Sequence, residues 1–132
     1  MESKVVEEQT KGRILVVDDD PDMVRGLTRI LRKRGYEIGQ AYGGLEAVES
    51  VRRFCPNIVL MDIRMPDLNG IEAYTRMKQF HPELMAILMS GSCDLLPQAQ
   101  KSGAYLVLQK PLNPERLFEA LQPKVQSAQA VT

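Results

Sequence analysis

The sequence predicts a single α/β domain, in which five parallel strands alternate with five helices and form a sheet covered on both faces. Short apolar runs, typical of strands buried on both faces, recur along the chain, and segments with apolar residues at helical spacing separate them. The run Ile58 to Met61, which leads directly into Asp62, is the clearest strand. At 132 residues and 44% hydrophobic content, the chain has the size and composition of one packed domain.

The five strands follow from the apolar runs. They are expected at residues 13–17, 36–41, 57–62, 85–89 and 105–108. Cap residues mark the helix that follows the first strand, because Asp20 is a plausible N-cap, Pro21 suits a first helical position and Gly35 stops the helix.

The remaining helices are bounded by glycine and proline. Gly43 and Gly44 open the second helix, which Pro56 ends, and the third helix follows the turn at residues 66–70 and closes at Pro82. A weaker helix is expected at about residues 94–102. The last helix begins near Pro114, with the side chains of Leu117, Phe118 and Leu121 facing the core.

Composition argues against several classes of protein. Seventeen basic and seventeen acidic residues balance, so net charge gives no support for binding to nucleic acid or to an anionic membrane. No apolar run approaches the roughly 20 residues that span a bilayer. The first twelve residues are polar rather than a signal peptide, so a cytoplasmic location is expected. Cys55 and Cys93 are too few for a disulfide framework or a zinc site.

Polar termini flank the predicted domain. We expect residues 12–124 to fold as the domain, with flexible tails at residues 1–11 and 125–132.

The ends of the predicted strands carry the residues that are able to do chemistry. In a parallel sheet every strand ends at the same edge, and open α/β sheets bind their ligands there. Asp62 ends the central strand, where a charge beside a buried strand costs stability unless it is compensated. Asp18, Asp19, Ser90 and Lys110 end or follow three other strands. We therefore expect acids, a hydroxyl and an ammonium to converge at this edge.

Three neighbouring carboxylates favour a divalent cation. Two like charges about 4 Å apart repel by about 4 kcal/mol at an effective dielectric near 20. Hard oxygen ligands suit Mg²⁺, and the absence of a cluster of His or Cys ligands disfavours zinc, copper and iron. Asp62 is then able to attack a phosphorus centre and form an aspartyl phosphate, while Lys110 offsets charge and Ser90 donates a hydrogen bond.

Four segments carry these polar residues in order. They read ILVVDDDP at residues 14–21, LMDIRMPDLNG at 60–70, MSG at 89–91 and QKP at 109–111. Together they resemble the receiver domain of bacterial two-component response regulators, the family of the chemotaxis receiver, over about residues 12–124. The resemblance implies a flavodoxin-like, doubly wound (βα)₅ fold with strand order 2-1-3-4-5.

The resemblance also implies a role for each site residue. Asp62 would be the phosphoacceptor, Lys110 would contact the phosphoryl group and Ser90 would be the switch hydroxyl. Mg²⁺ would be bound directly by Asp19, by Asp62 and by the backbone carbonyl of Arg64. Asp18 would complete the ligand set through a water molecule.

Partners are implied in the same way. The phosphoryl donor would be the phosphohistidine of a sensor histidine kinase, and the recipient of the signal would be a downstream protein or output domain. The protein itself would be a phosphoacceptor rather than an enzyme, and homodimers would form through the face made by residues 94–102, 105–108 and the last helix. The sequence leaves open the cognate kinase, and whether the domain stands alone or belongs to a larger regulator.

One position departs from the family pattern. The family usually has an aromatic residue three positions before the lysine, and here that position is Val107. Tyr105 is two positions away, which places it on the same strand face as Val107 but displaced along the strand, so it is not a clean replacement.

Two other functions compete with the phosphorylation switch. A scaffold would bind its partner without phosphorylation, and Val107 favours a form of this in which the usual aromatic switch is missing. A phosphohydrolase of the haloacid dehalogenase type would use Asp18 as its nucleophile, but the chain has no cap insertion.

Overall fold

The computed structural model describes the backbone of residues 11–131 and the side chains of residues 11–122. Its five strands form one parallel sheet in the order β2-β1-β3-β4-β5, as expected. The strands are β1 Arg13–Val17, β2 Glu37–Ala41, β3 Ile58–Asp62, β4 Met85–Ser90 and β5 Leu106–Gln109. The helices are α2 Pro21–Lys33, α3 Gly44–Phe54, α4 Gly70–Phe80, α5 Leu96–Lys101 and α6 Pro114–Val131, and the 3₁₀ turn η1 Cys93–Leu95 precedes α5.

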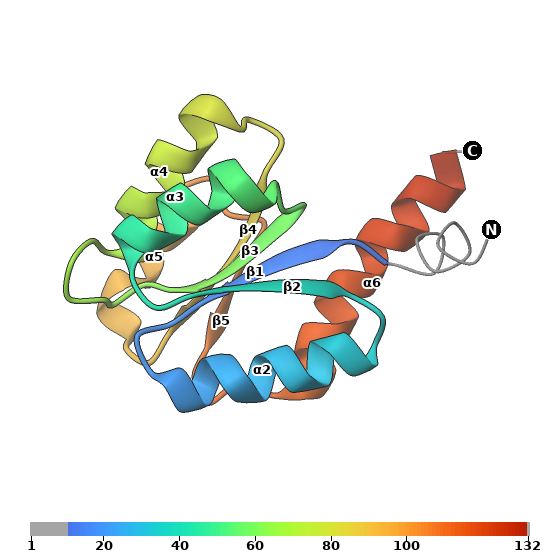
Figure 1. Cartoon of the computed structure of the whole chain (residues 1–132), viewed down its shortest axis with the longest axis horizontal. Coiled ribbons are helices and arrows are strands. Elements are labelled where there is room, and N and C mark those ends of the chain that lie inside the picture. The colour runs from blue at the N-terminus through green and yellow to red at the C-terminus, as the bar shows by residue number, and fades with distance from the viewer. Residues whose placement is uncertain (1–10, 132) are drawn as a thin grey trace.

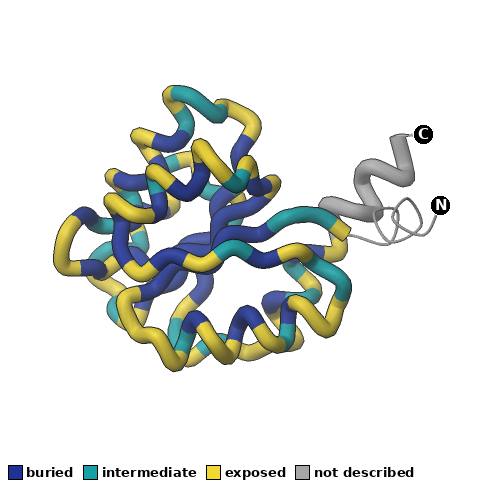
Figure 2. The backbone as a smooth tube through the Cα atoms, viewed as in Figure 1, coloured by how far each residue is buried: buried dark blue, intermediate teal, exposed yellow. Residues whose placement is uncertain are grey.

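The sheet lies between two layers of helices. Helices α3, α4 and α5 cover one face, and α2 and α6 cover the other (Figure 1). Alternate residues of each strand enter the two cores, so that Val59 packs on the first face and Leu60 on the second. All five residues of β3 are buried. The buried centre and the mixed surface of the helices are visible in Figure 2.

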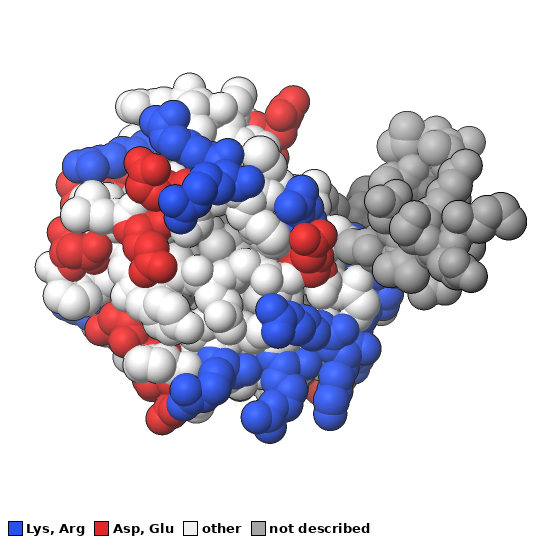
Figure 3. All heavy atoms as spheres, viewed as in Figure 1, with Lys and Arg blue, Asp and Glu red and all other residues white. Residues whose placement is uncertain are grey.

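Charge is unevenly distributed over this surface. Lys and Arg side chains gather along α2, where Arg25, Arg29, Arg32 and Lys33 are exposed (Figure 3). Within the described part of the chain, none of the helices has both the length and the apolar character that crossing a bilayer requires. The predicted tails at residues 1–11 and 125–132 lie almost entirely outside the described side chains, so they stay predictions.

N-cap side chains bind the first turns of two helices that start where the strands end, α2 and α4. The carboxylate of Asp20 accepts a hydrogen bond from the Asp22 N–H at 3.0 Å and caps α2, as predicted. Asn69 caps α4 in the same way, because its side chain accepts from the Glu72 N–H at 2.9 Å. These caps fix the points at which the chain turns from loop to helix beside the strand ends.

Several predicted limits differ from the structure. The second and third strands begin one residue later than expected, at Glu37 and Ile58, and the fourth strand ends one residue later, at Ser90. The fifth strand begins and ends one residue later than expected, because Gln109 pairs with Ser90 and the Lys110 N–H donates to the Ser90 carbonyl at 2.8 Å. The predicted helix at residues 94–102 is a 3₁₀ turn followed by a short α-helix. Pro97 lacks an N–H and is tolerated only in a first helical turn, so the α-helix begins at Leu96.

Gly70 allows a close backbone approach at the end of β3. A Cβ added at Gly70 would lie 2.5 Å from the Asp62 carbonyl oxygen and 3.1 Å from the Cα of Ile63. The Gly70 N–H also donates to the Ile63 carbonyl at 2.8 Å. The loop that leaves Asp62 therefore returns onto its own strand end, which only glycine permits without displacing the backbone.

Substitution of Gly70 by Ala should lower the free energy of unfolding by about 1–3 kcal/mol, because the new methyl group overlaps the Asp62 backbone. Gly26→Ala is the matched control, since a Cβ at Gly26 meets nothing within 4 Å in the middle of α2. The control should raise stability by about 0.5–1 kcal/mol. Urea titrations of both variants measure these changes, and equal effects at the two positions would contradict the close approach.

Candidate functional site

Strand register brings two acids together at the edge of the sheet. Val17 of β1 pairs with Met61 of β3, so the residues that follow them, Asp18 and Asp62, lie side by side. Both carboxylates are buried, with 0% and 6% of the residue exposed. Asp19 follows on the exposed side of the same loop. The structure thus assembles the three acids that the sequence predicted for this edge.

Lys110 lies between the two buried acids. Its ammonium nitrogen is 2.8 Å from Asp18 Oδ2 and 3.3 Å from Asp62 Oδ2. The other oxygen of Asp18 accepts a hydrogen bond from the Asp20 N–H at 3.0 Å. Both oxygens of Asp18 are therefore engaged, while the Asp62 carboxylate contacts Lys110 at one oxygen.

The surroundings shift the pKa of both partners upward. Burial raises the pKa of the Asp62 carboxyl, the Lys110 charge lowers it in part, and the neighbouring charges of Asp18 and Asp19 raise it further. For Lys110, burial by itself would lower the pKa of the ammonium, but the hydrogen bond to Asp18 and the charges of Asp62 and Asp18 outweigh burial, so the pKa is raised. The ammonium therefore stays charged between the two acids.

The acidic cluster fits a magnesium ion. Asp18, Asp19 and Asp62 each offer a carboxylate oxygen, and these oxygens lie within 4.8 Å of one another. Ligands at about 2.1 Å in an octahedron are separated by about 3–4 Å, so small adjustments would bring them around one ion. Three carboxylates and one ammonium leave two net negative charges, which a divalent cation balances.

Ser90 ends β4 beside this cluster, but its hydroxyl is bound within its own loop. Ser90 is 1% exposed. Its Oγ donates to the Ser92 carbonyl at 2.6 Å and accepts from the Ser92 N–H at 3.1 Å. The hydroxyl must leave these bonds before it can donate to a group on Asp62.

Two acidic residues at the rim, Asp67 and Asp94, were not singled out from the sequence. The Asp67 carboxylate accepts from the Leu45 and Gly44 N–H groups at the start of α3, each at 3.1 Å, and these bonds lower the pKa of Asp67. The Asp94 carboxylate accepts from the Ser92 hydroxyl and forms an ion pair with Arg64, and both contacts lower its pKa. No local pattern marks either residue, because Arg64 is distant in the sequence from Asp94 and the start of α3 is distant from Asp67.

Val107 and Tyr105 point to different parts of the molecule. Val107 packs against the core under α3, α4 and α5, whereas Tyr105 precedes β5 and is 41% exposed. The Tyr105 hydroxyl donates to the Ala120 carbonyl in α6 at 3.4 Å. The expectation that Tyr105 shares the strand face of Val107 is therefore wrong, because Tyr105 lies outside the regular strand.

The raised pKa of Asp62 has a consequence for stability. Because the folded-state pKa of Asp62 lies above the unfolded-state value, ionisation of Asp62 opposes folding. The stability that the protonated carboxyl contributes is therefore lost as the pH rises through the folded-state pKa. Asp62→Asn should therefore be more stable than the parent protein at pH 7, and the difference should shrink as the pH falls through the raised folded-state pKa towards the ordinary carboxyl value. Urea midpoints with EDTA present measure this. Equal midpoints at pH 7 would contradict it.

Comparison with known proteins agrees with this geometry. Residues 14–122 match the response regulator receiver domain family. The chain is 41% identical over 112 residues to the chemotaxis protein CheY of Thermotoga maritima, which covers 83% of this chain and 93% of that protein. It is 40% identical over 121 residues to the transcriptional regulatory protein ZraR of Klebsiella oxytoca, covering 90% of this chain but 26% of that longer protein.

Solved structures show the same fold. A CheY-like receiver domain from Methanospirillum hungatei superposes with a TM-score of 0.82 at 29% identity, covering 91% of this chain and 98% of that one. A chain of the CheX-CheY-BeF₃-Mg²⁺ complex from Borrelia burgdorferi gives a TM-score of 0.81 at 27% identity, covering 90% and 92%.

Receiver domains are phosphoacceptors that generally lack enzymatic activity. They bind Mg²⁺ in an acidic pocket, accept phosphate from histidine kinases and act on downstream targets. The match over residues 14–122, the strand order and the acidic cluster beside a lysine all agree. The chain belongs to the response regulator receiver domain family of two-component signalling proteins.

Proposed function

We propose that this domain is a phosphorylation-dependent switch, in which Asp62 accepts a phosphoryl group from the phosphohistidine of a sensor histidine kinase. The observation that carries the proposal is the position of the Lys110 ammonium, 2.8 Å from Asp18 and 3.3 Å from Asp62 at a shared strand edge. A cation beside the acceptor carboxylate offsets the negative charge that a phosphoryl group brings.

The transfer is a displacement at phosphorus. An oxygen of the ionised Asp62 carboxylate forms a bond to phosphorus while the bond from phosphorus to the donor imidazole nitrogen breaks, and that nitrogen keeps the electron pair. The carboxylate needs no general base, because it carries no proton when ionised. Positioning by the buried strand β3 and charge compensation by Lys110 are the main contributions of the protein.

Magnesium would be held by Asp19, by Asp62 and by the backbone carbonyl of Arg64, with Asp18 acting through water. When bound, the ion would supply further compensation for the charge of the phosphoryl oxygens. The indirect role of Asp18 is supported by its two existing contacts, with Lys110 and with the Asp20 N–H. Asp19 is exposed and lies within reach of the other two acids.

Ser90 would transmit the change. Its hydroxyl would leave the Ser92 backbone and donate to an oxygen of the phosphoryl group, and the loop from Ser90 to η1 would move with it. The two hydrogen bonds between Ser90 and Ser92 support this role, because they are made by the same hydroxyl that the phosphoryl group would attract.

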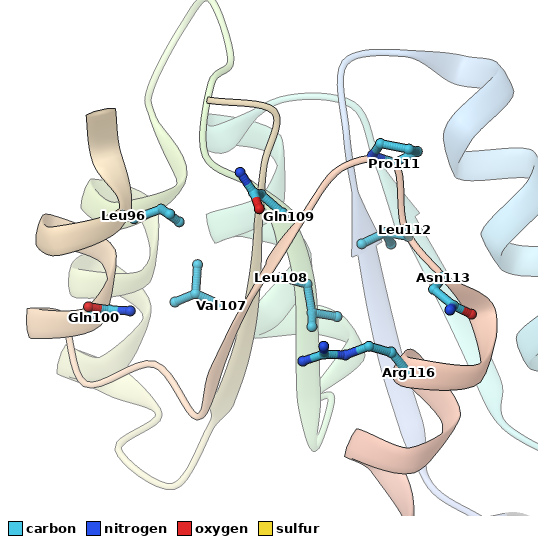
Figure 4. A pocket seen from close by; sticks show the side chains of 9 residues that line it. All are labelled: Leu96, Gln100, Val107, Leu108, Gln109, Pro111, Leu112, Asn113 and Arg116. Atoms are coloured by element: carbon cyan, nitrogen blue, oxygen red, sulfur yellow. The ribbon is translucent and has the colours of Figure 1, made fainter. Parts of the chain in front are cut away.

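The surface that responds would be the face formed by α5, β5 and α6. A pocket of about 280 Å³ lies on this face (Figure 4). Leu96 of α5 and Val107 of β5 line one part of it, and Arg116 of α6 lies at the other. The small Val107 side chain leaves this pocket without the aromatic ring that the family usually places there. A partner would meet a hollow of mixed character, in which the amide side chains of Gln100, Gln109 and Asn113 lie beside the apolar residues.

A scaffold that signals without phosphorylation is the second candidate. Val107 favours it, since no aromatic side chain stands at the position that couples the site to the surface in relatives. The hydrolase with Asp18 as nucleophile is disfavoured, because both oxygens of Asp18 are already hydrogen-bonded. Four expectations stay predictions. They are the cytoplasmic location, the lack of direct contact with nucleic acid, dimerisation through the α5–β5–α6 face and the domain limits at residues 12–124.

Incubation with Mg²⁺ and acetyl phosphate should add one phosphoryl group, measured as intact mass. Asp62→Asn should abolish the adduct, and Lys110→Ala should reduce its yield at least tenfold, since about 1.4 kcal/mol of lost charge compensation is a tenfold change. Glu37→Gln, at the opposite edge of the sheet, is the control and should leave the yield unchanged. An adduct that survives Asp62→Asn would assign the acceptor role to another residue.

Beryllofluoride, a phosphoryl mimic, separates the switch from the scaffold. With Mg²⁺ and beryllofluoride, amide resonances from Ser90 to Lys110 should shift in NMR spectra of the parent protein and stay in place in Asp62→Asn. Spectra in which only the residues next to Asp62 shift would favour the scaffold, because the site would then be filled without any response at the α5–β5–α6 face.

A further inference from the structure

An ion pair joins the two loops that border the site. The Arg64 guanidinium of the β3–α4 loop is 2.6 Å from Asp94 Oδ2 in η1, across 30 residues of sequence. The other oxygen of Asp94 accepts a hydrogen bond from the Ser92 hydroxyl. The pair thus connects the loop that follows the phosphoacceptor to the loop that follows the switch hydroxyl.

The same contacts lead on to Ser90. Ser92 is held at its side chain by Asp94 and at its backbone by the Ser90 hydroxyl, which contacts the Ser92 carbonyl and N–H. A continuous chain of polar contacts therefore runs from Arg64 through Asp94 and Ser92 to Ser90. Arg64 is thus connected, through side-chain and backbone contacts, to the hydroxyl that the proposed switch requires.

Arg64 lies within reach of a group on Asp62. They are two positions apart in the sequence, which bounds their Cα distance to about 7 Å, and an arginine side chain is of similar length. A phosphoryl group brings a charge of about −1.5 to −2 and three acceptor oxygens. Guanidinium groups bind such oxygens in bidentate geometry, whereas Asp94 offers a single charge.

The existing pair is poorly placed to resist this competition. The Arg64 and Asp94 side chains are 59% and 61% exposed. Exposed ion pairs stabilise a protein only weakly, because water screens them and both side chains lose freedom. The site beside Asp62 is buried, so the same guanidinium would interact more strongly with an anion there.

We propose that Arg64 is a phosphoryl-binding residue, which Asp94 binds before phosphorylation. Phosphorylation of Asp62 draws the guanidinium from Asp94 to the phosphoryl oxygens, and the released η1 loop frees the hydroxyl of Ser90. Asp94 is a positioning residue in this scheme. The exchange supplies a connection between the site and α5 that does not require an aromatic side chain at Val107. The inference rests on Asp62 being the phosphoacceptor.

Beryllofluoride affinity at saturating Mg²⁺, measured by ¹⁹F NMR, tests the exchange. Asp94→Asn should lower the Kd about two- to fivefold, because the ion pair that Arg64 must otherwise break stabilises the unbound state by about that factor. Arg64→Gln should raise the Kd by about fivefold, and adding Asp94→Asn to Arg64→Gln should then have no effect. Glu37→Gln, which removes an exposed acid paired with Arg13 at the far edge, should leave the Kd unchanged.

A second measurement distinguishes exchange from a merely structural ion pair. The coupling between Arg64 and Asp94 is obtained from the stabilities of the parent, the two single variants and the double variant in urea. The coupling should be present without ligand and lost with Mg²⁺ and beryllofluoride bound. A structural pair would show the same coupling in both states, which would overturn the proposal.

The outcomes for affinity separate this inference from the proposed function. A parent protein that binds beryllofluoride, together with an Asp94→Asn variant of unchanged Kd, overturns the exchange alone. An Asp94→Asn effect that persists in the Arg64→Gln background also overturns it, because the acid would then act through its charge rather than through Arg64. A parent protein that does not bind beryllofluoride overturns the phosphoacceptor site, and the exchange with it.

Discussion

The contact of one ammonium with two buried carboxylates is the interaction on which the site depends. Parallel register places Asp18 beside Asp62, and neither side chain is open to water. Like charges in such a place repel by several kcal/mol, so the strands can present both acids together only with a cation between them. Lys110 is that cation, and its pKa is raised by the same two acids. The Lys110 charge thus offsets part of the rise that burial causes in the pKa of the Asp62 carboxyl.

The loop after β3 is where the site and the rest of the domain are joined. Gly70 closes this loop against the Asp62 backbone, and Asp67 holds it to the start of α3 through two N–H groups. Arg64, between Asp62 and these anchors, reaches across to η1. The backbone of the loop is therefore fixed at its end, while one long charged side chain near the acceptor remains exposed. That combination suits a segment that must bind an anion without unfolding.

Strand and cap chemistry made much of this structure predictable. Uninterrupted apolar runs identified β1, β3 and β4, and the cap at Asp20 followed from an acid placed before a proline. The weaker elements were predicted less well. Edge strand β5 is one residue later because its limits are set by pairing with β4. The segment before α5 is a 3₁₀ turn because Pro97 lies three residues after the start of the expected helix.

The convergence of Asp18, Asp62 and Lys110 was contained in the order of the segments, because parallel strands must all end at one edge. The order of the segments did not contain three other contacts. These are the contacts of Arg64 with Asp94, of Asp67 with α3, and of the Ser90 hydroxyl with its own loop. These depend on how separate loops approach one another and on which rotamer each side chain adopts. Local pattern does not determine the contacts of Arg64 and Asp67, since their partners belong to other elements and meet them only when the helices pack on the sheet. The Ser90 hydroxyl has a partner in its own loop, but the sequence does not choose among its staggered orientations.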